Sequence, residues 1–380
     1  MQKFILLLLF FNSFQKISAQ TWVDSLDVYA REKYMPASKF QWTWMKASLL
    51  YTMLKQYDNC TDEKKKIYLQ FIQTAMDKTV AVANGKKPNA VAAGLGMAFL
   101  VRVTKEEKYK KVCDKIFADY MKIKRTKEGG VSHLRNDIEL WDDTIFMIGQ
   151  FLLEMYKATN DEKYIDELVK QITIHHDKLQ DKKSGLWVHG YDEDRKSHCT
   201  FCGQLNWPEK TTGKSAEVWG RGNGWIVVTS SDALDIIPKT NPSWNLLATY
   251  LKEMIEHLPE LQNQQNGHWY QLPVRNTEPK NYIESSSTAM FAYGISKAIQ
   301  LGLVKDTTYQ KSIDLAYSGL RNYSIKPVST KYITTKNVCK GTCIGNKTYY
   351  LKRKVKNEKP YSIGMFINFG RLYEAQKFNQ

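Results

Sequence analysis

Three loops with a shared pattern of glycine, histidine and aromatic residues recur along this chain of 380 residues. They read Glu-Gly-Gly-Val-Ser-His at 128–133, Ser-Gly-Leu-Trp-Val-His at 184–189 and Asn-Gly-His-Trp-Tyr-Gln at 266–271. A helical segment follows each loop after a variable insertion; these helices are predicted over 140–156, 217–236 and 282–301. The recurrence predicts a fold built from repeated units.

Polar turns mark further helices between these segments, and they lie at 104–109, 159–164 and 306–310. Alternating strand patterns are short and few, so the chain is predicted to be all-α. The repeating unit is a helical hairpin of roughly 55 residues, and a chain of this length holds about six.

Six hairpins cannot bury their apolar faces singly. A closed ring of inner and outer helices, an (α/α)6 barrel, solves this problem, and an open superhelical array of helix pairs is the alternative. In a ring, the loops at one end of the inner helices surround a central pocket. The three similar loops are therefore expected to converge on a site there.

The N-terminus reads as a secretory signal peptide over residues 1–19, with cleavage near Ala19. Its apolar run from Phe4 to Phe11 is far shorter than the roughly 20 residues that cross a bilayer. No Pro- or Ser-rich linker divides the remainder, so residues 20–380 are predicted to form a single catalytic domain. We expect a periplasmic or secreted protein that is not inserted in a membrane.

The chain carries a formal net charge of +16 at pH 7. Nucleic acid is a poor partner for an exported protein, and the lysines are not interleaved with aromatic residues as in a nucleic-acid groove. An acidic oligosaccharide would be steered by this positive field. The alternative is a surface whose charges are merely solvated.

Six cysteines stand at 60, 113, 199, 202, 339 and 343. Export favours disulfides, but His198-Cys199-x-x-Cys202 together with Cys339-x-x-x-Cys343 also has zinc-like spacing. A disulfide within or between the two pairs, structural zinc and unpaired thiols all remain open.

Residues 217–225 read Glu-Val-Trp-Gly-Arg-Gly-Asn-Gly-Trp, a composition that suits an anionic sugar. Arg221 can hold a carboxylate through its planar fork of donors. Trp219 and Trp225 offer flat faces for a pyranose ring, and the glycines let backbone approach a ligand. The alternative is a glycine-rich turn that opens a buried helix, with the tryptophans in the core.

Two adjacent acids, Asp142 and Asp143, lie at the start of a long apolar segment. Neighbours on a helix diverge by about 100°, so one is expected to point into the pocket while the other caps the helix or meets solvent. His133 and His189 hold equivalent positions in the first two loops. No spaced metal-ligand set stands outside the cysteine pairs, so no metal or cofactor is predicted.

Five segments together resemble glycoside hydrolase family 105, the unsaturated rhamnogalacturonyl hydrolases and related unsaturated uronyl hydrolases. They lie at 140–147, 185–192, 219–225, 282–294 and 338–345, and the likeness runs from about Trp42 to Glu374. The resemblance implies an (α/α)6 barrel and a metal-free reaction on the 4,5-unsaturated uronic acid that polysaccharide lyases produce. One aspartate protonates C4 and helps water to add at C5, and by match to the Trp-x-Asp motif it is Asp143.

The same resemblance implies a set of substrate contacts, which comprises His189, Arg221, Trp225, His133, Trp219 and Trp44. Where the family often has a second aspartate, this chain has Asn89, which can form hydrogen bonds but cannot titrate. The basic chain favours a sulfated rhamnose next to the uronate, as in ulvan fragments, over plain rhamnogalacturonan. The alternatives are a catalytically silent carbohydrate-binding barrel and an ordinary glycosidase that pairs Asp143 with Glu284.

Overall fold

The computed structural model describes residues 21–305 and 307–378, and most of them are helical. The predicted signal peptide lies outside these residues. Six inner helices are α2 (Trp44–Asn59), α5 (Leu95–Thr104), α7 (Thr144–Thr159), α9 (Gly220–Ile236), α11 (Ser285–Leu301) and α14 (Pro360–Phe378). Six outer helices are α1 (Trp22–Tyr34), α3 (Asp62–Thr79), α6 (Glu107–Met121), α8 (Lys163–Leu179), α10 (Ser243–Leu261) and α12 (Thr307–Tyr323).

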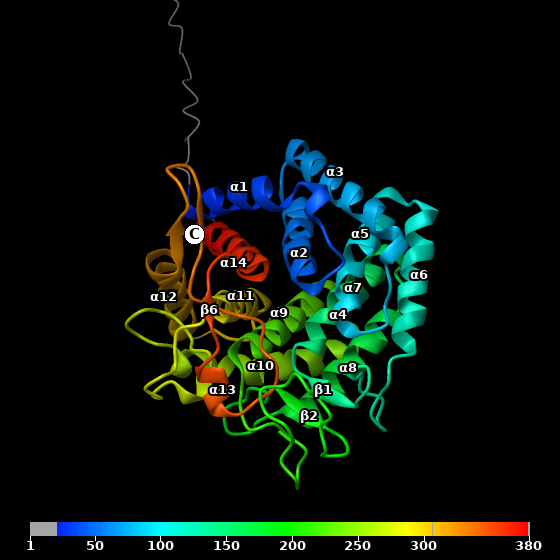
Figure 1. Cartoon of the computed structure of the whole chain (residues 1–380). Helices are drawn as coiled ribbons and strands as arrows, with labels where there is room; N and C mark the ends of the chain where they lie inside the picture. Colours follow the sequence, from blue (N-terminus) through cyan, green and yellow to red (C-terminus); the bar gives the residue numbers. More distant parts are fainter. Residues whose placement is uncertain (1–20, 306, 379–380) are drawn as a thin grey trace, which may run out of the picture.

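The inner helices close a ring (Figure 1). Each contacts the next in the order α2, α5, α7, α9, α11 and α14, and α14 returns to contact α2. An open array would leave its first and last helices apart. The predicted (α/α)6 barrel is therefore confirmed over the described residues, and the superhelical alternative is wrong.

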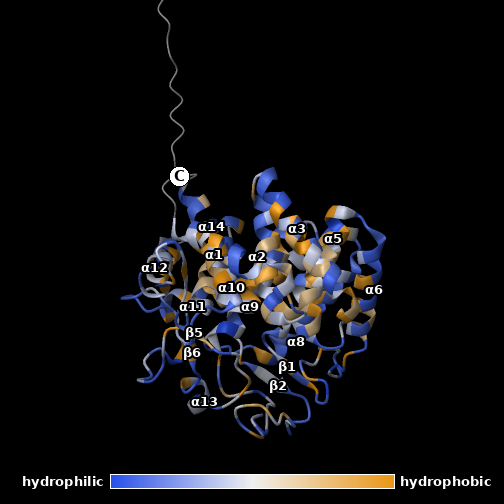
Figure 2. Ribbon diagram, turned by 45° about the horizontal axis from the view of Figure 1, so that its top comes forward, coloured by the Kyte–Doolittle hydropathy of each residue, from blue (hydrophilic) through white to orange (hydrophobic). Residues whose placement is uncertain are grey.

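Burial explains which helices line the ring. Every residue of α9 from Gly220 to Leu234 is buried, whereas α8 buries one face and exposes the other. Figure 2 shows the apolar residues gathered where the helices face one another. Glycine permits the closest approach: a Cβ on Gly294 of α11 would lie 1.9 Å from Val227 Cγ1 of α9.

Three predicted helix starts were too early. The helices begin at Thr144, Gly220 and Ser285, because the residues before each of them pair with another loop in short β-structure. Strand β1 (Glu139–Trp141) pairs antiparallel with β2 (Gly190–Asp192), and single bridges join Val188 to Val218 and Tyr270 to Ile283. This pairing ties the similar loops to the N-terminal ends of the inner helices.

The other elements are short. Two further antiparallel pairs join β3 (Ile325–Pro327) to β4 (Ile333–Thr335) and β5 (Val338–Cys339) to β6 (Val355–Lys356). The small helices are α4 (Pro88–Val91) and α13 (Lys347–Leu351). Figure 1 places β1, β2 and α13 on one side of the barrel, its lower side in that view.

The cysteines divide between a disulfide and thiols. Cys199 and Cys202 form a disulfide, whereas Cys339 is a buried thiol and Cys343 a half-buried one. The sulfurs of Cys199 and Cys202 are thus bonded to each other, so these four cysteines do not form a zinc site in this structure. Of the three alternatives, the structure has a disulfide within the first pair and unpaired thiols in the second.

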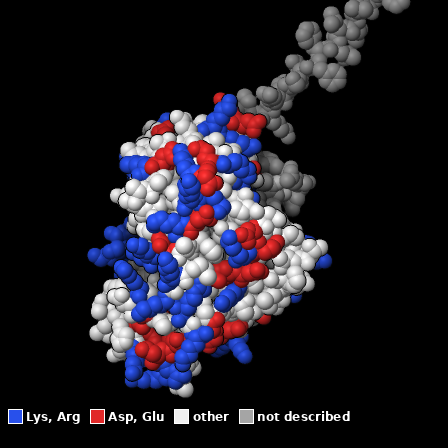
Figure 3. All heavy atoms as spheres, turned by 90° about the vertical axis from the view of Figure 1, so that its right-hand side faces the viewer, with Lys and Arg blue, Asp and Glu red and all other residues white. Residues whose placement is uncertain are grey.

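The positive charge is spread among acidic residues. On the face in Figure 3, Lys and Arg alternate with Asp and Glu. None of the helices within the described part of the chain has the length and apolar character needed to span a bilayer.

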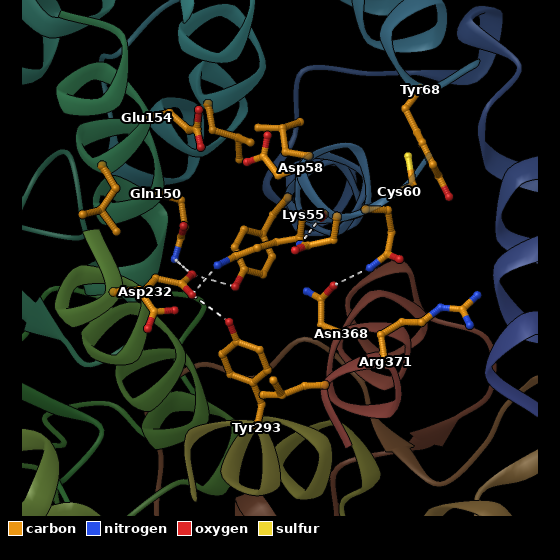
Figure 4. A pocket seen from close by; sticks show the side chains of 18 of the residues that line it. Lys55, Asp58, Cys60, Tyr68, Gln150, Glu154, Asp232, Tyr293, Asn368 and Arg371 are labelled. Atoms are coloured by element: carbon orange, nitrogen blue, oxygen red, sulfur yellow. Dashed lines mark hydrogen bonds and ion pairs between the residues drawn. The ribbon is translucent and has the colours of Figure 1, made fainter. Parts of the chain in front are cut away.

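A cavity of about 700 Å³ lies at one end of the ring axis (Figure 4). Its walls come from the middle and C-terminal parts of several inner helices, including Lys55 of α2, Gln150 of α7, Asp232 of α9 and Tyr293 of α11. This is the opposite end from the loops that precede the inner helices. The lining acids are already paired: Asp232 with Lys55, Asp235 with Lys297, and both Glu154 and Asp58 with Arg102 and Lys157.

Asp232 is the centre of a buried polar network. It accepts hydrogen bonds from Lys55 Nζ at 2.6 Å, Tyr51 Oη at 2.7 Å, Tyr293 Oη at 2.8 Å and Gln150 Nε2 at 3.1 Å. Burial alone would raise the pKa of Asp232, but Lys55 and the two tyrosines hold it below its ordinary value. The network joins α2, α7, α9 and α11, so it stabilises the closed ring.

We expect Asp232→Ala to lower the free energy of unfolding by about 3 kcal/mol at pH 7, because it leaves buried donors without an acceptor. Since the folded-state pKa is depressed, this contribution is present above the unfolded pKa of about 4 and is lost as pH falls through the folded value. Urea denaturation at pH 7 and pH 3 measures both effects. Asp235→Ala, three residues along α9 and half-exposed, is the control and should cost about 1 kcal/mol or less. Equal losses in the two variants would contradict a special role for Asp232.

Candidate active site

The candidate site lies at the N-terminal ends of the inner helices. Asp143 stands directly before α7, where it occupies the N-cap position without using its side chain to cap the helix. Arg221 is in the first turn of α9, Glu284 directly precedes α11, and Tyr361 begins α14. The loops holding His133 and His189 are brought to the same end by β1 and β2.

Trp141 joins the two histidines. Its ring stacks on His133 at 4.6 Å between centroids, with the planes 3° apart, and its edge meets His189 at 5.5 Å. The predicted convergence of the first two loops is therefore observed. Trp141 was not among the predicted site residues, although it is the tryptophan of the Trp-x-Asp motif that identified Asp143.

Asp143 belongs to a short chain of polar side chains. Asn89 Nδ2 lies 3.2 Å from His133 Nε2, and His133 Nδ1 lies 2.8 Å from Thr144 Oγ1 and 3.5 Å from Asp143 Oδ1. Because an amide nitrogen only donates, Nε2 of His133 accepts and Nδ1 carries the proton. Burial lowers the pKa of His133, so the ring is neutral beside Asp143.

The two aspartates occupy different environments. The side chain of Asp143 is 13% exposed, whereas that of Asp142 is fully buried. Burial raises the pKa of both carboxyl groups. For Asp143, His133 when protonated and Arg221 oppose this rise, whereas for Asp142 the negative charge of Asp143 adds to it. The charged form of Asp142 is therefore the more strongly disfavoured, and Asp143 alone of the pair reaches the surface of the site.

One expectation for this pair was wrong. Asp142 neither caps the helix nor meets solvent, since it lies in the turn between β1 and α7, where its backbone N–H bonds the carbonyl of His189. Its carboxyl group packs against Gly222, where a Cβ would lie 2.0 Å from Asp142 Oδ2. The helix-based divergence did not apply, because the β1–β2 pairing keeps the chain extended up to Trp141.

His189 lies deeper than His133. Its Nδ1 is 2.6 Å from Tyr350 Oη, and its Nε2 is 3.8 Å from Asp142 Oδ1. Burial lowers its pKa well below the ordinary value, and its ring packs on Trp219 at 4.4 Å. Tyr350, from α13, is a second residue that the sequence reasoning missed, because no local pattern linked it to a loop 161 positions earlier.

Arg221 is fully buried and its donors are largely occupied. Nη1 donates to the carbonyl of Cys339 at 2.9 Å and lies 3.4 Å from Glu284 Oε1, while Nη2 donates to the carbonyl of Lys340 at 3.0 Å. The guanidinium stands 4.7 Å from the ring centres of both Trp219 and Tyr361. The fork expected to hold a substrate carboxylate therefore holds the 339–340 segment, and only Nε lacks a partner.

The remaining predicted contacts, Trp44 and Trp225, lie in different surroundings. Trp44 stacks on Tyr361 at 5.4 Å, which links it to the Arg221 cluster. Trp225 is 1% exposed and packs on Phe146 at 4.1 Å, so its ring is in the core and offers no open face. The three glycines of this segment also pack against protein atoms. A Cβ added at Gly220 would clash with Tyr270, one at Gly222 with Asp142 and one at Gly224 with Met290.

Segment 217–225 thus opens a buried helix, as its alternative interpretation stated. The substrate contacts expected of Arg221, Trp219 and Trp225 stay predictions. Glu284 is fully buried and caps α11 through Ser287 N at 2.7 Å, while it also accepts from Ser286 Oγ and Cys339 N. With its oxygens so occupied, it is unsuited to act as the partner of Asp143 in an ordinary glycosidase.

Comparisons with known proteins agree with this architecture. The sequence profile of Glycosyl Hydrolase Family 88 matches residues 16–377. The unsaturated rhamnogalacturonyl hydrolase YesR of Bacillus subtilis (strain 168) is 28% identical over 286 residues, 72% of this chain and 75% of that protein. An unsaturated 3S-rhamnoglycuronyl hydrolase of Alteromonas sp. (strain LOR) is 26% identical over 195 residues, 50% of this chain and 42% of that protein.

Solved structures share the fold. A family 105 glycoside hydrolase from C. acetobutylicum ATCC 824 superposes with a TM-score of 0.81 at 24% identity, covering 94% of this chain and all of that one. A possible family 105 member from Salmonella enterica serovar Paratyphi A superposes with a TM-score of 0.73 at 26% identity, covering 89% of this chain and 84% of that one.

Proposed function

Because the chain belongs to the clan of glycoside hydrolase families 88 and 105, among the unsaturated rhamnogalacturonyl hydrolases of family 105, we propose that it removes a terminal 4,5-unsaturated uronic acid from lyase-generated oligosaccharides, with Asp143 as the acid and base. The uronate is glucuronyl or galacturonyl. The neighbouring sugar is rhamnose or sulfated rhamnose, which the basic charge of the chain and the names of its relatives support.

The observation that carries this proposal is the environment of Asp143. It is a carboxyl group whose pKa is raised by burial, it is partly exposed, and a neutral histidine lies beside it. A carboxyl group with a raised pKa retains its proton at a higher pH, as a general acid requires. Burial raises the pKa of its neighbour Asp142 as well, but the side chain of Asp142 is fully buried and out of reach of a substrate.

The reaction needs one such group. Asp143 donates its proton to C4 of the double bond, and the positive charge that develops at C5 is shared with the ring oxygen. The resulting carboxylate then takes a proton from water as the water oxygen bonds to C5. The product is a hemiketal at C5. Its bond from C5 to the ring oxygen breaks to give a ketone at C5 and a hemiacetal at C1. The hemiacetal then breaks its bond to the neighbouring sugar, which leaves as an alcohol while C1 becomes an aldehyde. The proton taken from water restores Asp143 for the next turnover.

The experiment follows the conjugated double bond. The protein is incubated with lyase digests of rhamnogalacturonan and of ulvan, and ultraviolet absorbance is recorded alongside product analysis. We expect absorbance to fall as the terminal uronate is released, with saturated oligosaccharides of the same sequence left intact. Binding without loss of absorbance on either digest would overturn the proposal in favour of a silent carbohydrate-binding barrel.

Asn89→Asp tests the role of Asn89. A carboxylate at this position would accept a hydrogen bond from Nε2 of His133 and so favour the protonated imidazolium ring. The positive charge of that ring would lie nearer to Asp143 than the new negative charge at position 89 does. The pKa of Asp143 should fall, so we expect the alkaline limb of the activity profile to move to lower pH while turnover persists. Rate measurements across pH check this.

The matched control is Asn84→Asp. It adds the same negative charge at a side chain that bonds the nearby backbone groups of Val82 and Lys86. It should leave the pH profile in place. If the alkaline limb of the Asn89→Asp variant moved to higher pH, the new carboxylate would be acting directly on Asp143. Orienting His133 would then not be the role of Asn89.

We also propose that the protein acts in the periplasm or outside the cell, on the basis of its N-terminal sequence. Cell fractionation, with N-terminal sequencing of the recovered protein, tests this. Recovery of the protein in the cytoplasm with Met1 retained would contradict it.

A further inference from the structure

Three aspartates meet at the Glu139–Asp192 end of the paired strands β1 and β2. Asp137 precedes β1, Asp192 ends β2, and Asp194 follows two residues later. One carboxylate oxygen from each lies within 4.8 Å of the others. Asp137 and Asp192 are buried and Asp194 is exposed, so the cluster sits at the surface with two of its members facing inward.

This cluster has no basic partner. Among the residues that the structure describes, no Lys, Arg or His forms an ion pair with Asp137, Asp192 or Asp194, nor with nearby Glu139. The chain carries a net charge of +16, and most of its other buried acids are paired. Like charges held together without compensation are costly, so this grouping needs a physical reason.

A buried oxygen in the cluster also lacks a donor. Asp192 is fully buried; its Oδ1 accepts from Arg195 N at 2.7 Å, while Oδ2 has no hydrogen-bond partner. A buried carboxylate oxygen without a donor has lost its hydrogen bonds to water and has gained none from the protein, which is unfavourable.

We propose that Asp137, Asp192 and Asp194 bind one calcium ion. One oxygen of each carboxylate lies within 4.8 Å of the others, close enough for all three to reach a single ion. Magnesium demands strict octahedral geometry and usually keeps several waters, so it is less often held by protein carboxylates alone. All three ligands are hard oxygen donors, as calcium prefers.

The site lies where a cation would organise the candidate active site. Asp192 faces Glu139 across the β1–β2 pair, and these strands lead directly to Asp142 on one side and follow His189 on the other. Asp137 Oδ2 also accepts from His198 N at 2.6 Å, which connects the cluster to the Cys199–Cys202 disulfide. Calcium here is structural: it positions the loops, and proton transfer by Asp143 does not pass through it.

The test uses the whole protein after treatment with a chelator and gel filtration. Calorimetric titration with calcium chloride should show one site per chain, with a Kd between about 10 µM and 1 mM. The melting temperature should rise by several degrees at saturating calcium and by less with magnesium. Terbium, a calcium substitute, should luminesce on excitation of tryptophan, because Trp141 lies in β1.

Asp192→Asn should abolish calcium binding. Without calcium, the variant should melt at or above the temperature of the wild type, because one repelling charge is gone. With calcium, the wild type alone should gain stability. Asp194→Asn changes an exposed position that tolerates substitution, and it should weaken calcium binding at least tenfold. It replaces Asp192→Asn as the test if that variant does not fold.

Glu193→Gln is the matched control. It removes one charge from the same turn, but its carboxylate bonds Lys127 N at 2.8 Å and is not in the cluster. It should bind calcium as the wild type does. The proposal is overturned by the absence of calcium binding to the wild type, or by an equal loss of affinity in Glu193→Gln. Neither result depends on hydrolase activity, so this inference and the proposed function fail separately.

Discussion

Asp143→Asn is expected to reduce turnover of unsaturated oligosaccharides by about 10³-fold or more, because one group both donates the proton to C4 and accepts one from water. The amide has nearly the same shape, so circular dichroism and melting temperature should remain close to those of the wild type. Loss of ultraviolet absorbance at saturating substrate measures the rate.

Asp142→Asn is the matched control, one position away. Burial raises the pKa of Asp142 well above its ordinary value, so asparagine replaces a carboxyl group whose charged form is disfavoured. We expect its turnover to fall less than tenfold. Activity retained in Asp143→Asn, or equal losses in both variants, would show that the acid and base lies elsewhere.

Arg221→Met is expected to lower the free energy of unfolding by about 4 kcal/mol, because it leaves the carboxylate of Glu284 and two backbone carbonyls buried without their cation. Arg221→Lys should lose roughly half as much, since a single ammonium group cannot reproduce the planar contacts with Trp219 and Tyr361. Urea denaturation measures both variants.

Lys65→Met controls for the loss of a charge, because Lys65 pairs with the exposed Asp62 at the surface, and its stability should change by about 0.5 kcal/mol or less. Kinetics of Arg221→Lys separate the two roles considered for this residue. A variant that is as stable as the wild type but has a strongly raised KM would show that Arg221 holds the substrate carboxylate and is not mainly a structural cation.

Trp225 illustrates how composition can mislead. Glycine, arginine and tryptophan in one short segment fit a sugar site, yet the same residues also fit a buried helix that must pack tightly against its neighbours. The structure places Trp225 against Phe146 and the glycines against Tyr270, Asp142 and Met290. Local sequence could not distinguish the two, because burial depends on which elements lie opposite.

The closed barrel could be predicted from the chain because its cause is local and repeated. Helical periodicity defines each hairpin, and the recurrence of one loop pattern sets how many hairpins there are. The meeting of His133 and His189 followed from the same reasoning, since equivalent positions of a ring repeat converge at one end. Trp141, which separates the two rings, completes that arrangement.

Tertiary structure alone decided which of two adjacent aspartates is accessible, that Asn89 orients His133, that Tyr350 reaches His189, and that Asp137, Asp192 and Asp194 come together. Each depends on contacts between segments far apart in the chain. Periodicity determines which face of a helix is apolar, because that depends on neighbours three or four residues away. The pKa of a carboxyl group and the partners of a guanidinium depend instead on desolvation and on charges that only the folded chain brings near.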